Sequence, residues 1–459
     1  MKDTQKFKRH VRVCMGIFIT LFAVLIIYLG YSVLMYGEKW FATPYNPRLH
    51  SAAESIIAGS IYDRNGNRMV WTEDGSRQYA GNADTRRALS HVLGDAYGKS
   101  VGAETIFAKY LYGMDKDILE RIKDIGTGQD KNGNDISLTI DSELCEYIYD
   151  QMGGKKGSVV LLNYKTGEIL ASVSLPAFDP QTVGKDTPED TSLVDRATMG
   201  RYPPGSVMKI MTAAAAVEEG IDVKYTCTGE DIIEGQKVTC AGGTAHGELT
   251  LESAFTKSCN TYFANLAVKI GAQRLLQEAS KFGFNKEWNF SDINLYRSNF
   301  EVSEEEGDVA WAGIGQYNDL ITPMHAAMIA GAIANDGVMM EPKLLKSVDF
   351  NGYTQFNYTS AKAGQVTDAA TARTIKKYMM EVVKSGTGTS AAVKGTTMYG
   401  KTGTAEFVED GEVKNHSWFV GFIEDSAHPY AIAVIFEGAG YGSRYAAPMA
   451  GKVMARAIR

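Results

Sequence analysis

The first residues whose types and spacing could support catalysis are Ser206 and Lys209, which follow Tyr202-Pro203-Pro204-Gly205. Residues 207–219 are rich in Ala and Met and contain no helix breaker, so we expect a helix there that places Ser206 in its first turn. Lys209 lies three residues further on, hence on the same face. A serine hydroxyl becomes nucleophilic when a base takes its proton, and a desolvated, neutral lysine can be that base. The pair alone is a weak signal, because Ser and Lys are common on helix surfaces.

Two later motifs strengthen this interpretation. Ser258-Cys259-Asn260 is the only Ser-x-Asn in the chain, and Lys401-Thr402-Gly403-Thr404 follows it in an extended setting. Two other tripeptides resemble Lys401-Thr402-Gly403 but have the wrong setting for a catalytic motif. Lys165-Thr166-Gly167 precedes the nucleophile between two strand-like runs and predicts a hairpin turn, and Lys384-Ser385-Gly386 predicts a helix end. Ser-x-x-Lys, Ser-x-Asn and Lys-Thr-Gly occur in this order in penicillin-binding proteins and serine β-lactamases.

A predicted membrane anchor precedes these motifs. Residues 13–37 carry no charge and are mostly apolar, a length sufficient for a bilayer core of about 30 Å. Lys and Arg residues precede the run, which predicts a cytoplasmic N-terminus and an exported remainder. We expect an uncleaved anchor and not a signal peptide, because the run is long and no Ala-x-Ala site follows.

Composition excludes several other classes. The 459 residues allow two or three domains, and the net charge of −7 argues against nucleic acid as a partner. Five cysteines are too few for a disulfide scaffold. Cys227 and Cys240 flank a strand-like pair with Gly235 at its turn, and in an exported protein we expect them to form a disulfide.

No metal or other cofactor is predicted. Cys227, Cys240 and His246 have a loosely zinc-like spacing without an evident fourth ligand, and Cys259 is interpreted as a small packed residue. No motif surrounds His246, His325 or His416, which argues against a Ser-His-Asp enzyme.

The chain divides into three predicted parts: a short tail with the anchor (1–37), a small non-catalytic α+β pedestal (38–154) and a catalytic domain (155–459). In the pedestal we expect hairpins at Asn65-Gly66 and Asn132-Gly133 and a helix over 105–112. Helical patterns recur from 207 to about 383 in the catalytic domain. Strands are predicted at 157–162, 169–174, 398–407, 418–423 and 430–436, and a last helix at 448–458.

Several further motifs make the chain similar to class B penicillin-binding proteins, and specifically to their shorter members. The resemblance runs from about residue 40 to the C-terminus and leaves no segment for a glycosyltransferase domain. Ala58 departs from the family, which usually has arginine there. The motifs are Asn46-Pro47-Arg48, Gly59-Ser60-Ile61-Tyr62-Asp63-Arg64-Asn65-Gly66, Leu138-Thr139-Ile140-Asp141, Thr166-Gly167-Glu168-Ile169-Leu170-Ala171, Pro176-Ala177-Phe178-Asp179-Pro180, Gly313-Ile314-Gly315-Gln316, Thr322-Pro323 and Ala334-Asn335-Asp336-Gly337.

The resemblance implies an α+β fold, in which an antiparallel sheet with helices and an all-helical half enclose the active site. Ser206 would attack the D-Ala-D-Ala bond of a peptidoglycan stem peptide, with Lys209 as base, its pKa lowered by burial and by Lys401. Ser258 would relay the proton. Asn260 would hold Lys209 and bind the substrate amide. The substrate carboxylate would be bound by Lys401, Thr402 and Thr404, beside the backbone of Gly403. The N–H groups of Ser206 and Thr404 would form the oxyanion hole.

The predicted function is therefore a membrane-anchored D,D-transpeptidase that cross-links peptidoglycan and is acylated by β-lactams. The resemblance also implies a polytopic glycan polymerase of the shape, elongation, division and sporulation family as partner. A D,D-carboxypeptidase, a β-lactamase-like hydrolase and a non-enzymatic β-lactam sensor are the alternatives. Class A β-lactamases are excluded, because Val159 stands where their Glu-x-x-Leu-Asn element would have its glutamate.

Overall fold

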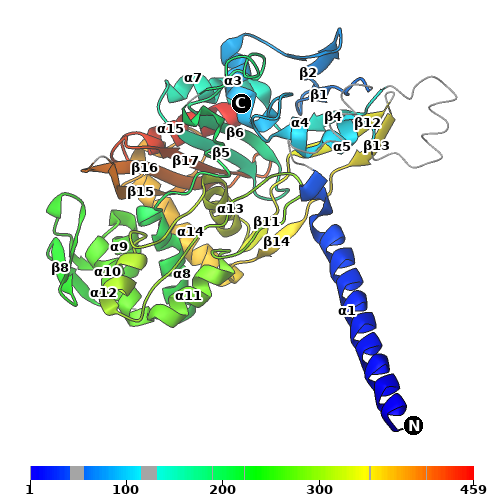
Figure 1. The fold of residues 1–459 in the computed structure, drawn as a ribbon. Coiled ribbons are helices and arrows are strands. Elements are labelled where there is room, and N and C mark those ends of the chain that lie inside the picture. Colours follow the sequence, from blue (N-terminus) through cyan, green and yellow to red (C-terminus); the bar gives the residue numbers. More distant parts are fainter. Residues whose placement is uncertain are drawn as a thin grey trace.

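The computed structural model describes residues 2–41, 56–114, 132–188, 190–221, 223–350, 353–409 and 411–459. Helix α1 (Lys2–Phe41) extends away from the rest of the molecule (Figure 1). Its segment Gln5–Val33 contains an apolar, unburied stretch that is long enough to cross a membrane as an anchor or a signal sequence would. The motif Asn46-Pro47-Arg48 lies outside the described residues.

The core of the molecule is a five-stranded antiparallel sheet with the strand order β15-β16-β17-β5-β6. Its strands are β5 (Gly157–Asn163), β6 (Ile169–Leu175), β15 (Met398–Glu409), β16 (Glu412–Ile423) and β17 (Tyr430–Phe436). The middle strands are continuous apolar runs because both faces are covered. All five predicted strands are confirmed, and β15 and β16 extend further toward their shared turn than expected.

Helices pack on both faces of this sheet (Figure 1). One face carries α3 (Ala83–Leu93), α7 (Ser142–Met152) and α15 (Ala446–Ala457). The other carries α13 (Pro323–Ala334) and α14 (Ala369–Lys384). The C-terminal helix and the helix end at Lys384 were both predicted.

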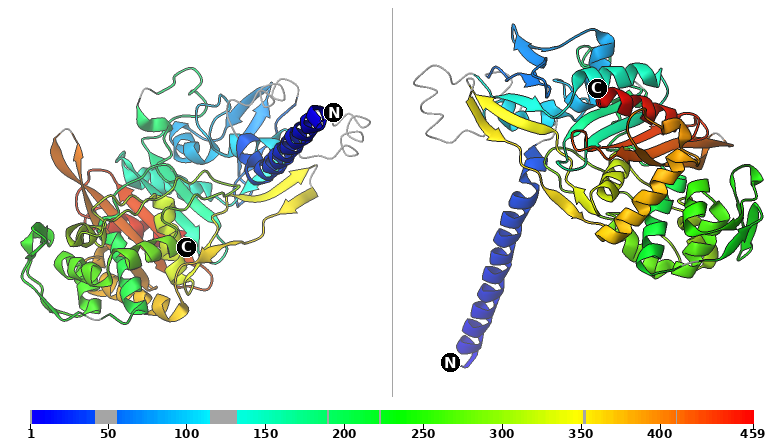
Figure 2. Two further views of the ribbon diagram at one scale, coloured as in Figure 1. Left: turned by 60° about the horizontal axis from the view of Figure 1, so that its bottom comes forward. Right: turned by 180° about the vertical axis from the view of Figure 1, so that it is seen from behind.

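A mainly helical region, green in Figure 2, begins at the 3₁₀ turn Gly205–Met208, which packs against the edge strand β15. It contains α8 (Lys209–Glu218), α9 (Leu251–Lys257), α10 (Asn260–Ile270), α11 (Ala272–Lys281) and α12 (Glu306–Ala312). It is not all-helical as expected, because two small antiparallel sheets interrupt it. These pair β7 (Tyr225–Cys227) with β10 (Gly247–Leu249) and β8 (Glu230–Ile233) with β9 (Gln236–Thr239). Glu234 and Gly235 both have positive φ, which gives the β8–β9 hairpin its tight turn.

The pedestal contains a six-stranded mixed sheet with the order β13-β12-β4-β1-β2-β3. Its members are β1 (Ile61–Tyr62), β2 (Arg68–Glu73), β3 (Ser76–Tyr79), β4 (Asp135–Leu138), β12 (Leu345–Phe350) and β13 (Tyr353–Asn357). The last two come from residues that follow α13, so a hairpin from the predicted catalytic segment completes the pedestal sheet. A two-stranded sheet of β11 (Val338–Met340) and β14 (Lys362–Gln365) connects this hairpin to the catalytic region.

Local predictions for the pedestal have mixed outcomes. The turn at Asn65-Gly66 is confirmed, since it joins β1 to β2 and Gly66 has φ +85°. At Asn132-Gly133 no hairpin is present in the described part of the chain, where Asn132 instead forms a parallel bridge with Ile57. The helix expected over 105–112 is divided into α4 (Ala103–Ile106) and α5 (Ala108–Leu111).

A buried ion pair supports the pedestal near Ala58, where the family usually has arginine. Arg77 binds Glu104 with an Nε–Oε1 distance of 2.9 Å, and its Nη1 donates to the carbonyls of Ala58 and Gly59. Glu104 is therefore part of a structural ion pair. Arg77, on strand β3, supplies a guanidinium beside Ala58.

Candidate active site

Ser206 lies on a 3₁₀ turn (Gly205–Met208) that leads directly into α8. The turn is tied to its surroundings on both sides, since Trp418 Nε1 donates to Pro203 O (3.0 Å) and Gly205 N donates to Gly315 O (2.9 Å). Gly205 has φ +52°, and a Cβ there would lie 2.6 Å from Thr404 O. Glycine at this position therefore allows the nucleophile turn to lie directly against strand β15.

Gly403 permits the same close approach from the side of the strand. A Cβ at Gly403 would lie 2.9 Å from Trp418 Cβ and 3.1 Å from Pro204 O. The glycine of the Lys-Thr-Gly motif, which has no side chain, thus lets the backbone of β15 lie beside the turn that carries Ser206. This explains why the two motifs, almost 200 residues apart in the sequence, meet in the fold.

Lys209 is completely buried at the start of α8. Its Nζ donates to Ser258 O (2.9 Å) and to Asn260 Oδ1 (2.7 Å), and lies 3.4 Å from Ser258 Oγ. Among the described residues, no hydrogen bond joins Lys209 Nζ to Ser206 Oγ. A neutral amine has two N–H groups and one lone pair, so the two shorter contacts can be made with the lone pair left free to accept a proton.

Ser258 connects the two lysines. It closes α9 in the left-handed conformation (φ +57°), and Cys259 then caps α10. Ser258 Oγ accepts a hydrogen bond of 2.8 Å from Lys401 Nζ. A non-glycine residue in this conformation is uncommon and strained, which is typical of a side chain held in place for function.

Lys401 is also completely buried, on β15, and its Nζ additionally donates to Thr402 O (3.1 Å). Burial lowers the pKa of Lys209 to about 8. Burial, and then the positive charge of Lys209, lower the pKa of Lys401 well below its usual value. Because the repulsion is mutual, we treat the two amines as one unit in which a second positive charge is disfavoured.

An open cleft of about 240 Å³ lies in front of these groups and is reached by Ser206, Asn260 and Thr404. Its other lining residues are Lys237, Thr239, Trp311, Ile314, Gln316 and Glu406. Asn260 Nδ2 donates to Thr239 O (2.9 Å), so one wall of the cleft comes from strand β9.

Thr402, which the family resemblance assigns to the substrate carboxylate, has its Oγ1 2.6 Å from Thr387 Oγ1. Like Ser258, Lys401 and Gly403, it is not among the residues that line the cleft. Thr387 follows the helix end at Lys384 and was not among the residues predicted for the site. The sequence also provided no prediction for three residues that line the cleft, Lys237, Trp311 and Glu406. Two others, Ile314 and Gln316, belong to one of the motifs on which the family resemblance rests.

The expected disulfide between Cys227 and Cys240 is not formed, and their sulfur atoms are 3.7 Å apart. Cys259, interpreted from the sequence as a packed small residue, lies at the same distance from Cys240.

Comparison with known proteins agrees with this fold. Residues 157–455 match the family model of the penicillin binding protein transpeptidase domain. This match covers more than half of the chain, which therefore belongs to the penicillin-binding protein transpeptidase family.

Among its relatives are two peptidoglycan D,D-transpeptidases named PbpA. The protein from Mycobacterium tuberculosis is 30% identical over 385 residues, which cover 76% of this chain and 78% of the relative. That from Mycolicibacterium smegmatis is 28% identical over 393 residues, which cover 78% and 80%.

Two solved structures have the same fold. Penicillin-binding protein A of M. tuberculosis, solved as a penicillin G acyl-enzyme complex, matches with a TM-score of 0.80 and 27% identity over 88% of this chain and all of that one. A D,D-transpeptidase domain from Eggerthella lenta matches with a TM-score of 0.75 and 31% identity over 87% and 97%.

Proposed function

We propose that this protein is a peptidoglycan D,D-transpeptidase that joins stem peptides through an acyl-enzyme on Ser206 and is acylated there by β-lactams. The observation that carries the proposal is the buried hydrogen-bonded chain Lys209–Ser258–Lys401 behind a cleft that contains Ser206. Such a chain can accept the serine proton and pass it on without a metal ligand or a histidine.

In the acylation step, Ser206 Oγ attacks the carbonyl carbon of the penultimate D-Ala, and the serine proton moves to the lone pair of Lys209. The N–H groups of Ser206 and Thr404 hold the negative oxygen, a contribution of about 3–4 kcal/mol for each donor. The C–N bond then breaks, and the leaving D-Ala amine receives a proton relayed through Ser258. In the second step an amine of another stem peptide attacks the ester, gives its proton to Lys209, and releases Ser206 with its proton restored.

The other site residues position the donor peptide. Asn260 reaches the cleft while it holds Lys209 through Oδ1, so it can bind the substrate amide and orient the base. Thr404 lies at the cleft, and Lys401 lies behind Ser258, where the positive charge of the Lys209–Lys401 pair favours a carboxylate bound nearby. We also assign Thr402 to this carboxylate pocket, at its base beside Thr387. Gly403 leaves the backbone of β15 accessible, so the peptide can lie along it as an added strand.

The backbone at Gly205 gives a direct test of how closely the turn must approach β15. Gly205→Ala forces a side chain into the space beside Thr404 O, and we expect penicillin acylation to slow about 100-fold, because small misplacements of a nucleophile cost this much. Gly220→Ala is the matched control. Gly220 also has positive φ (+63°), lies at the other end of α8 and has open space around it. Stopped-flow acylation rates that fall equally in both variants would contradict the proposed close approach.

The proposal includes a location and a partner. The basic residues before the apolar segment favour a cytoplasmic N-terminus, with α1 as an uncleaved anchor and the remainder outside the membrane. We retain residues 1–37, 38–154 and 155–459 as anchor, pedestal and transpeptidase domain, the pedestal sheet being completed by β12 and β13. The family resemblance favours a polytopic glycan polymerase of the shape, elongation, division and sporulation family as partner, with α1 and the pedestal as the contact surface.

Product analysis separates the proposed transpeptidase from its alternatives. The full-length protein in detergent is incubated with a synthetic stem pentapeptide ending in D-Ala-D-Ala and an excess of a second stem peptide with a free amine. We expect mass spectrometry to show release of one D-Ala and a joined product, and no product with Ser206→Ala. A hydrolysed tetrapeptide without joined product would establish a carboxypeptidase. Penicillin acylation without either peptide product would favour a sensor.

A further inference from the structure

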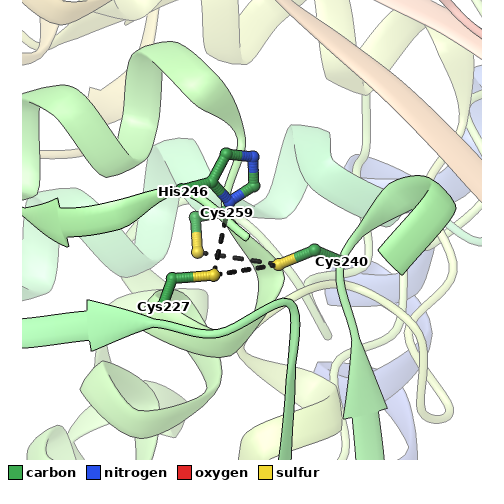
Figure 3. A group of neighbouring side chains, drawn as sticks. All are labelled: Cys227, Cys240, His246 and Cys259. Atoms are coloured by element: carbon green, nitrogen blue, oxygen red, sulfur yellow. Dashed lines mark hydrogen bonds between the residues drawn. The ribbon is translucent and has the colours of Figure 1, made fainter. Parts of the chain in front are cut away.

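Four metal-binding side chains meet beside the Ser-x-Asn motif, although they come from four separate elements (Figure 3). Cys227 ends strand β7, Cys240 follows β9, His246 precedes β10, and Cys259 is the N-cap of α10. Their four ligand atoms all lie within 4.8 Å of one another. Figure 3 shows the three sulfur atoms and the imidazole Nδ1 directed toward a common point.

The distances between the ligand atoms are those expected around a tetrahedral zinc ion. With Zn–S bonds of about 2.3 Å and Zn–N bonds of about 2.0–2.1 Å, a regular tetrahedron puts two sulfur ligands about 3.8 Å apart and sulfur and nitrogen about 3.6 Å apart. In this structure Cys240 Sγ is 3.7 Å from both Cys227 Sγ and Cys259 Sγ, and His246 Nδ1 is 3.4 Å from Cys227 Sγ. A disulfide would explain only one of these contacts, whereas a tetrahedron explains all of them.

We propose that Cys227, Cys240, Cys259 and His246 bind one structural Zn²⁺. The sequence indicates three candidate ligands without an evident fourth, and Cys259 was interpreted as a small packed residue, because only the fold brings it to the others. Three thiolates and one imidazole are the donor set of structural zinc sites and leave no open position for a substrate.

The surroundings fit a bound metal. The three cysteines are buried. Thr261 Oγ1 donates to Cys227 Sγ (3.3 Å), and Tyr262 N donates to Cys259 Sγ (3.4 Å), so the thiolates receive the supporting hydrogen bonds expected around a metal centre. Three thiolates with Zn²⁺ carry one net negative charge, and the Lys209–Lys401 pair provides positive charge on the other side of Ser258 and Asn260.

The position of the site gives it a role, which rests on the proposed function. Cys259 is the middle residue of Ser258-Cys259-Asn260, so a metal bond at Cys259 fixes its two catalytic neighbours. Cys240 is adjacent to Thr239, whose carbonyl accepts from Asn260 Nδ2. The ion therefore holds α10, β9 and the left-handed Ser258 in one arrangement, and its ligands are positioning residues for Lys209 and Ser258.

Metal analysis of the full-length protein in detergent tests the binding. We expect one zinc per chain by mass spectrometry of the metal content in the native protein and in the control Cys145→Ser, whose sulfur is equally buried but lies on α7 outside the cluster. In Cys227→Ser and His246→Ala we expect the zinc content to fall to less than a tenth. Unchanged zinc in both variants would refute the assignment, as would a native protein that contains no zinc and has a Cys227–Cys240 disulfide in its unreduced mass.

Cobalt substitution keeps the test valid where a variant fails to fold. After chelation and reloading with Co²⁺, the native protein should show thiolate-to-cobalt charge-transfer absorption together with the strong visible bands of tetrahedral coordination. An octahedral spectrum without charge-transfer bands would overturn the site.

The positioning role has its own readout. We expect chelation to slow penicillin acylation at least tenfold and added Zn²⁺, but not Mg²⁺, to restore it. Zinc binding without any effect on acylation would refute the positioning role and leave the metal site standing. If the zinc-loaded protein is not acylated at all, the proposed function fails instead.

Discussion

Ser206→Ala should abolish covalent labelling by penicillin G, whereas the native protein should gain one adduct per chain. A penicillin presents a carbonyl and a carboxylate in much the geometry of D-Ala-D-Ala, so Ser206 opens its ring and remains acylated. Intact-mass measurement of the full-length protein with excess drug gives the result directly. The sequence lacks the Glu-x-x-Leu-Asn element from which class A β-lactamases take the base that activates a deacylating water, so the native adduct should persist for many minutes.

The substitution should leave the fold intact, because removal of one half-buried hydroxyl costs about 1 kcal/mol or less. Ser280→Ala is a matched control on the exposed surface of α11 and should label like the native protein. An adduct that forms on Ser206→Ala would show that the nucleophile is wrong. Rapid release of the opened drug from the native protein would instead indicate a hydrolase.

Lys209→Met should lower the acylation rate by about 10²–10⁴-fold, the contribution typical of a positioned general base. Methionine keeps most of the buried volume and removes the proton acceptor. Lys452→Met, an exposed lysine on α15, should retain the native rate. A rate close to native in Lys209→Met would assign the base to another group.

The pH dependence tests the same role in the native protein. Because burial lowers the pKa of Lys209 to about 8, the amine is mostly protonated at pH 6 and cannot accept the serine proton. The acylation rate should therefore rise with pH, about tenfold per unit below 8, and level off above it. A rate that falls as pH rises through 8 would mean that the protonated amine is the active form.

The sequence predicted the parts of the site that depend on local motifs. Ser206, Ser258, Asn260 and Lys401 could be proposed because each lies in a short pattern with a chemical reason for its spacing. The inner strands of the sheet could be predicted because they are continuous apolar runs. The sequence predicts that Lys209 lies on the same helix face as Ser206, but a helix face does not indicate which groups from other segments accept hydrogen bonds from the amine. In the fold these acceptors are Asn260 Oδ1 and Ser258 O.

Long-range packing explains the other differences. Thr387 meets Thr402 only because the end of α14 lies against β15, and Cys259 meets Cys227 and Cys240 only because two small sheets cover the start of α10. No motif or residue spacing in the sequence predicts either of these two contacts. The same holds for β12, whose pairing with β4 joins segments about 200 residues apart.

That pairing constrains how the protein can be made. Leu345 of β12 pairs with Leu138 of β4, so the pedestal sheet is completed only after about three quarters of the chain has been synthesised. Until then β4 has an open edge that exposes unpaired backbone groups, a state in which strands pair with other chains. The pedestal is therefore not an independent N-terminal folding unit. Deletion of residues 38–154 would in turn leave β12 without its partner β4. A single cut between the pedestal and the catalytic domain would therefore leave both fragments with an incomplete sheet.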